Sequence, residues 1–556
     1  METIQTTIKS LVSTLFGVDE AVELTRTDPA FGDFATNIAM KLSKQLGENP
    51  RSIAEKLLPE IQKIDSVLEA SIAGPGFINI RVTDEVITRA LANATQTPQT
   101  LAGKVIVAEY SDPNPFKVLH AGHLYTTLVG DAVSRLLEDA GATVHRLNFG
   151  GDVGLHVGKT MWAIIKQFGG EYPDKMADVA ADKRLEWVSE RYVEGNEAYE
   201  TDESAKAEIV AANKRVYELH AANDHESEFA KIYWLGREWS YTGFDALYEQ
   251  LQVSPFERYI PESEVTPLGL EIVQKGLKQN VFVESEGAIV FPGEDHGLHT
   301  RVFINSGGLP TYEAKDLGLA AQKWQDYHFD QNVIITANDI VEYMKVVVKA
   351  LSNFYPEVAE RTHHLTHGVI KLPGGVKMSS RKGNILRAVD IIEAAEKAAE
   401  DLDNSSSNET ILAAIKYAFL KTRIGGDVIY DPAEAVALEG NSGPYLQYAH
   451  ARARSIASKS NVSITNNLTD LDQGERTLAI KLTEFSEVVG RAAESRNPHL
   501  ICTYLYELSQ EFNRFYEHNR VIEDPRESER LYLVNLYASV LKKGLEILGI
   551  HAPESM

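Results

Sequence analysis

The stretch that decides the fold is EYSDPNPFKVLHAGHLYTTLVGD, residues 109–131, which joins an apolar strand to a helix through an irregular loop. The preceding VIV at 105–107 predicts a buried parallel strand, and two prolines in the loop prevent an early helix. Apolar residues then recur at helical spacing. His120 and His123 are therefore expected at a helix N-terminus, where free N–H groups and a partial positive charge favour a phosphate group.

Gly122 stands between the two imidazoles. Its missing side chain would let a flat base or ribose approach the backbone while His120 and His123 bond phosphate oxygens, each bond being worth roughly 1.5–3 kcal/mol. The pattern H-x-x-H is also compatible with two surface histidines at a helix start. A zinc site is a third reading, but helical ligand pairs more often lie four residues apart and no cysteine cluster stands nearby. We therefore expect no protein-bound metal.

A second stretch, KMSSRKGN at 377–384, lies between glycine-containing segments and predicts a mobile loop. Its cations Lys377, Arg381 and Lys382 could close over a polyphosphate and neutralise charge that develops in a transition state. A solvated basic loop is the alternative.

HAGH and KMSSRKGN, in that order and far apart, resemble HIGH and KMSKS, the two signatures of class I aminoacyl-tRNA synthetases. Within this class, the resemblance narrows to arginyl-tRNA synthetases. It rests on SDPNPFKVLHAGHL around the first signature, on the GGDVG turn at 150–154, and on the segments LEG and SGPYLQYAHAR within 438–452. The resemblance runs from about residue 30 to the end of the chain and thins between 160 and 300.

Periodicity and this resemblance together predict a multidomain α/β protein. Residues 1–95 are expected to form a small α+β domain that contacts tRNA, with helical runs near 5–15 and 34–46 and strands near 69–73 and 76–82. Residues 100–400 are expected to form a Rossmann-type catalytic domain with a parallel sheet. An acidic, largely helical insert of unknown role is expected at about 160–300. Residues 409–556 predict an all-α bundle, which the resemblance makes the anticodon-binding domain. Its helices are expected near 410–424, 444–459, 475–495, 499–519 and 527–548.

Three further strands of the parallel sheet are expected at 302–304, 332–336 and 368–370. Ligands bind at the carboxyl ends of such strands, which is where both signature loops should emerge. NSSSN at 404–408 predicts a flexible break before the bundle.

The resemblance implies an enzyme that activates L-arginine with ATP and Mg²⁺ to arginyl-adenylate, releases pyrophosphate, and transfers arginine to the 3′-terminal adenosine of tRNA-Arg. A guanidinium group is a planar fork of donors, so carboxylates should bind it. The arginine-binding residues implied by the family are Glu109, Asn114, Tyr312, Asp316 and Asp339, the last standing where the family usually has Gln. Those implied for ATP are Pro113, His120, Gly122, His123, Gly151, Asp152, Lys377, Met378, Ser379 and Ser380.

Ser380 stands in the place of the second lysine of KMSKS, so a cation must come from elsewhere. Lys117, three residues before His120, is expected to reach the α-phosphate from the loop that already holds phosphate. Lys382 is expected to approach it only when the mobile KMSSRKGN loop closes. The predicted catalytic residues are thus Lys117, His120, His123, Lys377 and Lys382. The residues predicted to contact tRNA are Phe31, Asn79, Tyr445, Gln447, Tyr448 and Arg452, although the two tyrosines have a helical spacing that also fits a core position.

The bulk composition limits the alternatives. A net charge of −25 weighs against a general nucleic-acid coat protein. The single cysteine, Cys502, cannot form an internal disulfide and is expected to pack, which fits the cytoplasm. No apolar run approaches the roughly 20 residues of a membrane span. We expect the protein to be a monomer. GLHVGKT at 154–160 suggests a P-loop enzyme, but only three residues separate its glycines where a P-loop has four, so this alternative is disfavoured. A tRNA-binding paralogue without catalysis is a second alternative.

Overall fold

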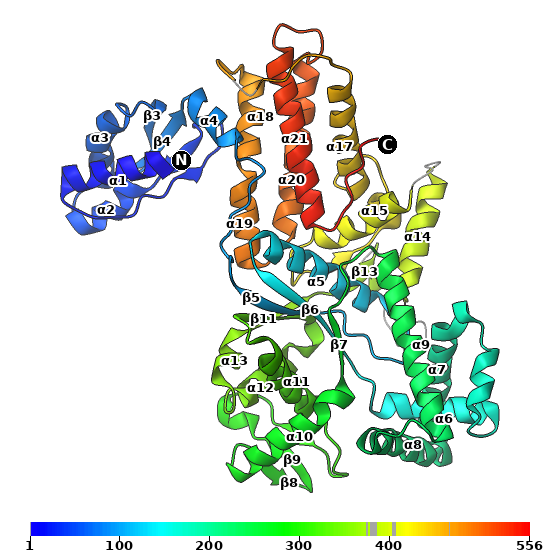
Figure 1. Cartoon of the computed structure of the whole chain (residues 1–556). Coiled ribbons are helices and arrows are strands. Elements are labelled where there is room, and N and C mark those ends of the chain that lie inside the picture. The colour runs from blue at the N-terminus through cyan, green and yellow to red at the C-terminus, as the bar shows by residue number, and fades with distance from the viewer. Residues whose placement is uncertain (1, 374–375, 378–385, 403–406, 466–467) are drawn as a thin grey trace.

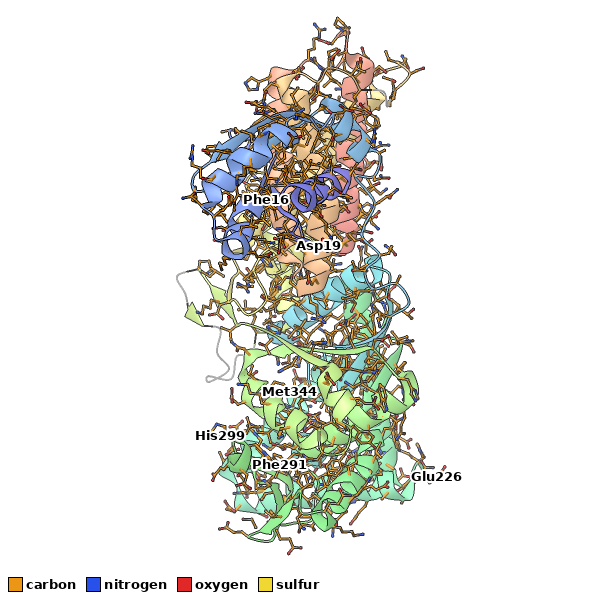
Figure 2. The ribbon with its side chains drawn as sticks, turned by 90° about the vertical axis from the view of Figure 1, so that its left-hand side faces the viewer. Phe16, Asp19, Glu226, Phe291, His299 and Met344 are labelled. Carbon is orange, nitrogen blue, oxygen red and sulfur yellow. The ribbon has the colours of Figure 1, made fainter. Side chains whose placement is uncertain are left out.

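The computed structural model describes residues 2–373, 376–377, 386–402, 407–465 and 468–556 (Figure 1). A parallel sheet lies at the middle of the molecule, with the N-terminal domain and the C-terminal helices on one side and two further lobes on the other. In the turned view of Figure 2, the N-terminal domain lies in the half of the molecule marked by Phe16 and Asp19, and the opposite half contains Met344, Phe291 and His299. No helix within the described ranges is long and apolar enough to cross a membrane.

The N-terminal domain is an antiparallel four-stranded sheet, in the order β1-β2-β4-β3, covered by helices. The expected helical run at 34–46 is wrong at its start, because residues 34–36 form β2 and the helix begins at Ile38. The elements are α1 (Glu2–Phe16), β1 (Thr25–Arg26), β2 (Phe34–Thr36), α2 (Ile38–Leu46), α3 (Pro50–Ile61), β3 (Val67–Ala73), β4 (Phe77–Val82) and α4 (Asp84–Leu91).

The parallel sheet has the order β12-β11-β5-β6-β7. Its central strand β5 is the apolar stretch before the first signature, and α5 follows it, as the sequence predicts. The strands are β5 (Val105–Glu109), β6 (Thr143–Gly150), β7 (Arg258–Pro261), β11 (Gln331–Ala337) and β12 (Thr362–His367), and α5 is Ala121–Asp139.

Two of the expected strands do not belong to this sheet. Residues 302–304 lie in β10 (Arg301–Ile304), which pairs antiparallel with β9 (Ala288–Phe291) in a separate small sheet completed by β8 (Val283–Ser285). Residues 368–370 follow β12, and β13 (Ile370–Leu372) pairs with β14 (Val376–Lys377) and β15 (Val428–Ile429). A short apolar run predicts a strand but carries no information about its partner.

The predicted insert divides into two parts. Helices α6 to α9 form a lobe with its own hydrophobic core, which includes Phe229 and Trp239, and the chain then returns to the main sheet as the edge strand β7. The prediction of one insert to residue 300 is therefore wrong, because β7 divides it. The lobe comprises α6 (Leu155–Phe168), two short 3₁₀ turns (Pro173–Asp178, Ala181–Lys183), α7 (Arg184–Thr201), α8 (Glu203–Ala222) and α9 (Glu228–Gln250).

A second lobe carries the small antiparallel sheet and packs beneath the main sheet (Figure 1). Its helix α11 follows the loop of the small sheet directly, so residues at the start of α11 lie close to β10. The helices are α10 (Glu262–Lys278), α11 (Tyr312–Tyr327), α12 (Val341–Leu351) and α13 (Pro356–Arg361), with 3₁₀ turns at Gly293–His296 and Asn338–Ile340.

The C-terminal residues form the predicted helical bundle, with one difference. The expected helix at 475–495 is two helices that meet at Glu484. Cys502 is buried in the bundle, as expected. The helices are α14 (Ala388–Asp401), α15 (Asn408–Leu420), α16 (Pro432–Ala435), α17 (Gly443–Ser458), α18 (Gln473–Thr483), α19 (Phe485–Ser495), α20 (His499–His518) and α21 (Glu527–Ile547). Most of the predicted break at 404–408 lies outside the described residues.

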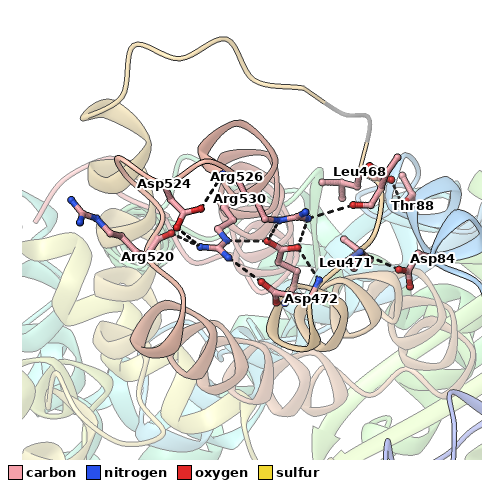
Figure 3. Close-up of polar contacts among 11 residues, drawn as sticks. Asp84, Thr88, Leu468, Leu471, Asp472, Arg520, Asp524, Arg526 and Arg530 are labelled. Atoms are coloured by element: carbon pink, nitrogen blue, oxygen red, sulfur yellow. Dashed lines mark hydrogen bonds and ion pairs between the residues drawn. The ribbon is translucent and has the colours of Figure 1, made fainter.

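Polar contacts join the bundle to the N-terminal domain (Figure 3). The backbone N–H of Leu471 donates to the carboxylate of Asp84 at 3.0 Å, and Arg476 reaches Asp33 at 2.6 Å. Within the bundle, the fully buried Glu475 accepts from Arg526 at 2.8 Å and Arg530 at 2.9 Å. Removing one partner from such a buried network leaves an uncompensated charge, so the network stabilises the end of the bundle that the N-terminal domain contacts.

Candidate active site

A cavity of about 580 Å³ opens at the carboxyl ends of β5 and β11, beside the N-terminus of α5. Nine residues that the sequence assigned to arginine or ATP line it: Glu109, Asn114, His120, Gly122, His123, Gly151, Tyr312, Asp316 and Asp339. A larger cavity lies between the N-terminal domain and α19, but none of these residues lines it. The predicted site residues from five separate segments therefore converge on one place.

His120 and His123 form a stacked pair at the start of α5. His120 is the N-cap residue, and its Nδ1 accepts from the backbone N–H of His123 at 3.3 Å, while His123 Nδ1 accepts from His120 N–H at 3.3 Å. The ring centroids are 3.7 Å apart. Since each Nδ1 accepts, the neutral rings carry their protons on Nε2. The pair thus supplies two Nε2–H donors next to a helix N-terminus.

Burial is the main reason why the pKa of both imidazoles is lowered, and the positive charge of Lys117 lowers each pKa further. A Cβ at Gly122 would stand 2.8 Å from His120 Cε1, so a larger residue there would displace the ring of His120. Gly122 is therefore required by the histidine ring itself, a reason that the sequence did not reveal.

Behind the histidines lies His367 of β12, a buried side chain that the sequence reading missed. Its Nδ1 donates to the carbonyl of Gly368 at 2.8 Å, and its Nε2 lies 2.7 Å from Thr126 Oγ1, which lines the cavity. The polar sequence THHLTH has little strand character, which is why both β12 and His367 were overlooked.

Two buried glutamates on the opposite wall are each paired with a lysine of α11. Glu109 forms an ion pair with Lys323, whose Nζ also donates to Asn332 Oδ1 at 2.9 Å. Glu262 pairs with Lys315 in the same way. Glu262 and both lysines were missed, because pairs so far apart in the sequence leave no local pattern.

Asp316 forms no ion pair with any of the described residues. Its carboxylate accepts a hydrogen bond from the Tyr343 hydroxyl, and burial raises its pKa to about 8, although that hydrogen bond acts in the opposite direction. Asp339 lies exposed at the rim, and Tyr312 lies one turn before Asp316 on α11, as predicted. Burial and Glu109 likewise raise the pKa of Asp112, which the sequence reading had not included.

Arg301 of β10 is a cation in the wall that was also missed. Its guanidinium lies 5.2 Å from the ring centroid of Tyr343, and Nη1 lies 3.2 Å from Glu313.

Of the predicted ATP or catalytic residues whose side chains the structure describes, three do not line the cavity. Asp152 is fully buried and accepts from Ser263 N–H at 2.9 Å and Ser263 Oγ at 2.7 Å, and Arg237 lies 3.1 Å away. Its predicted contact with ATP is therefore wrong in this structure, because its oxygens are already bonded. Pro113 is buried beneath Gly150. Lys117 places its Nζ 4.3 Å from the ring centroid of Tyr192, beside the histidine pair.

The P-loop alternative is excluded by the position of its lysine. Lys159 lies inside α6, and its Nζ donates to Asn196 Oδ1 at 2.8 Å. Its glycine Gly158 is likewise helical and packs against α8, so no phosphate cradle exists there.

The second signature falls largely outside the described residues. Lys377 is the last residue of β14, and nothing is described for its side chain. Met378, Ser379, Ser380, Arg381 and Lys382 lie outside the described ranges, so their assignments stay predictions.

The predicted tRNA residues divide into accessible and inaccessible ones. Phe31 and Tyr448 are 63% and 44% exposed. Asn79 is buried in β4, and the fully buried Gln447 donates to the His551 carbonyl at 2.7 Å, so the prediction of contacts to tRNA is wrong for both. Tyr445 is half-buried, accepting from Asn513 at 3.0 Å, and Arg452 lies over the ring of Tyr516.

Comparisons with known proteins agree with this geometry. Residues 86–431 match the family of tRNA synthetases class I (R), catalytic domain; residues 446–556 match the DALR anticodon binding domain; and residues 2–82 match the arginyl tRNA synthetase N terminal domain. An arginine–tRNA ligase of Mannheimia succiniciproducens is 30% identical, covering 95% of this chain and 94% of the relative. One from Porphyromonas gingivalis is 28% identical over the whole of both chains.

Solved structures show the same fold. The arginyl-tRNA synthetase of Thermus thermophilus superimposes with a TM-score of 0.78 at 25% identity over 100% of both chains. That of Plasmodium falciparum gives 0.79 at 22% identity, covering 100% of this chain and 99% of the other. The chain therefore belongs to the arginyl-tRNA synthetases, the ATP-dependent class I ligases that attach arginine to tRNA.

Proposed function

We propose that the cavity between α5 and α11 activates L-arginine with ATP and passes it to the 3′-terminal adenosine of tRNA-Arg. The observation that carries this proposal is that one cavity is lined both by a histidine pair at a helix N-terminus and by Asp316, a half-buried acid for which no ion pair is found among the described residues. The histidine pair at the helix N-terminus suits phosphate oxygens, and the carboxylate of Asp316 suits a guanidinium group.

The arginine substrate would lie along the acidic wall. The Asp316 carboxylate, with Tyr312 on the same face of α11, would accept from the guanidinium. Glu109, held in place by Lys323, would accept from the α-ammonium group. Asn114 uses its carbonyl oxygen to accept from Gly151 N–H at 2.9 Å, which leaves its amide N–H groups to donate to the arginine carboxylate.

In the first step, a carboxylate oxygen of arginine attacks the α-phosphorus of ATP, and the bond to pyrophosphate breaks. His120 and His123 would donate from Nε2 to the phosphate oxygens, and Lys117 would contribute positive charge from the same side. In the second step, the 2′-hydroxyl of the terminal adenosine attacks the arginyl carbonyl, and AMP leaves. Positioning and charge stabilisation dominate both steps.

Mg²⁺ is proposed to arrive with ATP and to neutralise phosphate charge. The described residues hold no group of three His, Cys, Asp or Glu side chains that could bind an ion by themselves, which is compatible with a metal carried by the substrate.

We extend the proposal to the rest of the molecule. Residues 1–95 would contact the tRNA and residues 409–556 its anticodon, with residues 100–400 as the catalytic domain. The exposed Phe31 and Tyr448 support the first two assignments, because exposed aromatic rings can stack on bases. We also propose a monomer that acts in the cytoplasm, in accord with its role in protein synthesis and its one buried cysteine.

Exchange of labelled pyrophosphate into ATP tests the proposal. We expect exchange that depends on arginine and is not supported by lysine or citrulline, and we expect it to require tRNA-Arg, because separate domains around the site could let tRNA order it. Robust exchange without tRNA would contradict that requirement alone. No exchange in the presence of tRNA, together with normal tRNA binding, would instead identify a paralogue without catalysis.

A further inference from the structure

One face of α7, in the helical lobe, lies against the two chain segments that flank the signatures. Its residues recur every three or four positions, so they form one stripe along the helix. The stripe consists of Glu186, Ser189, Tyr192, Asn196 and Tyr199. Gly195, next to this stripe, allows α7 to approach α6 closely, because a Cβ there would stand 2.1 Å from the Lys159 carbonyl oxygen. The position of the stripe is therefore fixed by backbone packing.

The stripe reaches the first signature at two points. The backbone N–H of Val118 donates to Ser189 Oγ at 3.2 Å. Lys117 Nζ lies 4.3 Å from the ring centroid of Tyr192. Two consecutive residues of the loop before HAGH thus contact the same helix.

The stripe also reaches the segment that follows the second signature. Glu186 forms an ion pair with Arg387 at 3.0 Å. The backbone of Arg387 pairs with that of His120 in an isolated antiparallel β-bridge. Next to it, the backbone N–H of Ala121 donates to the Leu386 carbonyl at 2.8 Å. One helix therefore holds both segments around the N-terminus of α5.

The partner of Lys117 is unusual in its chemistry. Among the described residues, no carboxylate forms an ion pair with Lys117, and the residue that faces its ammonium group is an aromatic ring. A ring face attracts an ammonium group but accepts no strong hydrogen bond from it. A carboxylate would neutralise the charge, whereas the ring restrains the side chain and leaves its positive charge and N–H donors for a phosphate.

We infer that Tyr192 is a positioning residue for Lys117, and that through it the helical lobe contributes to arginine activation. The inference rests on the proposed function, since it concerns the lysine that would contribute charge to the first step. It assigns a catalytic contribution to a part of the chain whose own sequence revealed none.

The test measures adenylate formation in a single turnover of the full-length enzyme. Tyr192→Leu keeps an apolar side chain but removes the ring, and should slow adenylate formation about tenfold with little change in KM for ATP or arginine. Tyr192→Phe keeps the ring and should react close to the wild-type rate. A purely structural role would not separate Phe from Leu in this way.

Tyr199→Leu is the matched control. Tyr199 lies two turns further along the same face, is similarly half-buried, and its ring lies 4.3 Å from the Nζ of a different lysine, Lys159. Because the ring of Tyr199 contacts Lys159 and not Lys117, this variant should leave the Lys117 side chain in place and retain the wild-type rate of adenylate formation.

A double variant provides the second readout. If Tyr192 acts through Lys117, Lys117→Ala with Tyr192→Leu should be about as slow as Lys117→Ala alone. Additive losses, or a Tyr192→Leu enzyme with the wild-type rate, would overturn the inference. If the wild-type enzyme itself forms no adenylate with tRNA-Arg present, the proposed function fails instead, so the two failures are distinguishable.

Discussion

The two sides of the cavity carry opposite chemistry, and burial shifts the pKa of ionisable groups on both sides toward the neutral form. On the phosphate side, burial lowers the pKa of His120 and His123 and lowers that of Lys117 to about 8. On the arginine side, burial raises the pKa of Asp316 to about 8. A phosphate on one side and a guanidinium group on the other would favour the charged forms of the lysine and the aspartate. Each side is thus suited to one kind of ligand.

Pairing distinguishes the acids on the arginine side. Glu109 and Glu262 are each held by a buried lysine, whereas Asp316 accepts a hydrogen bond from the Tyr343 hydroxyl and forms no ion pair within the described part of the chain. A paired carboxylate can orient a substrate, but an unpaired one gains most from a cation. We therefore expect Asp316 to select arginine and Glu109 to position it.

The largest expected effect lies on the phosphate side. Lys117→Ala should lower the rate of adenylate formation by about two to three orders of magnitude, roughly 3–4 kcal/mol, because a preorganised positive charge is lost. Rapid-quench measurement of arginyl-adenylate gives the rate, and KM for ATP should change less. A variant that forms adenylate at a near-normal rate would show that Lys117 is only a solvated loop lysine and does not contribute to the phosphate side of the cavity.

The next effect lies on the arginine side. Asp316→Asn should raise KM for arginine by roughly 10- to 100-fold, through loss of about 1.5–3 kcal/mol from a charged hydrogen bond. KM for ATP serves as the internal control and should stay nearly constant. An unchanged KM for arginine would mean that another group binds the guanidinium.

A smaller effect comes from pH. The carboxyl of Asp316 has a pKa of about 8, so below pH 8 it must lose its proton before it can bind a guanidinium as a carboxylate. Raising the pH from about 6.5 to 8 should therefore tighten arginine binding by roughly tenfold, with little further gain above that.

Four neighbouring side chains also contribute to the pKa of this carboxyl: Tyr343, Glu109, Glu262 and Lys323. Isothermal titration in buffers of different ionisation enthalpy measures both the affinity and the proton released. Asp316→Asn should bind arginine with no such pH dependence. Release of no proton by the wild-type protein would show that Asp316 is already ionised.

The smallest effect should come from Asp339. This residue is exposed at the rim, where solvent screens charge, so Asp339→Asn should raise KM for arginine only up to about fivefold, or 0.2–1 kcal/mol. Steady-state kinetics measure the change. A loss as large as that of Asp316→Asn would show that the rim becomes buried when arginine binds.

The periodic parts of the molecule were predictable from sequence. Helices α15, α17, α20 and α21 were expected to within a few residues, because helical amphipathicity is a local pattern. Strand β12 was missed because THHLTH carries three histidines and two threonines where a strand of a parallel sheet usually has apolar residues.

Burial of polar side chains was much harder to predict. Asn79, Asp152 and Gln447 were expected at binding surfaces, and each is buried. A polar residue type suggests exposure, but these three side chains find hydrogen-bond partners or strand neighbours inside the fold. The sequence does not show which polar residues have such partners.

The sequence by itself determined the strand, loop and helix that present His120 and His123, together with the membership in the family, because caps, prolines and periodicity act over a few residues. Only the tertiary structure decided how the charges are paired. Glu109 and Lys323 are 214 residues apart, and Tyr343 comes to Asp316 from another helix. Such pairs form only when distant segments pack together and exclude water, so no local pattern in the chain records them.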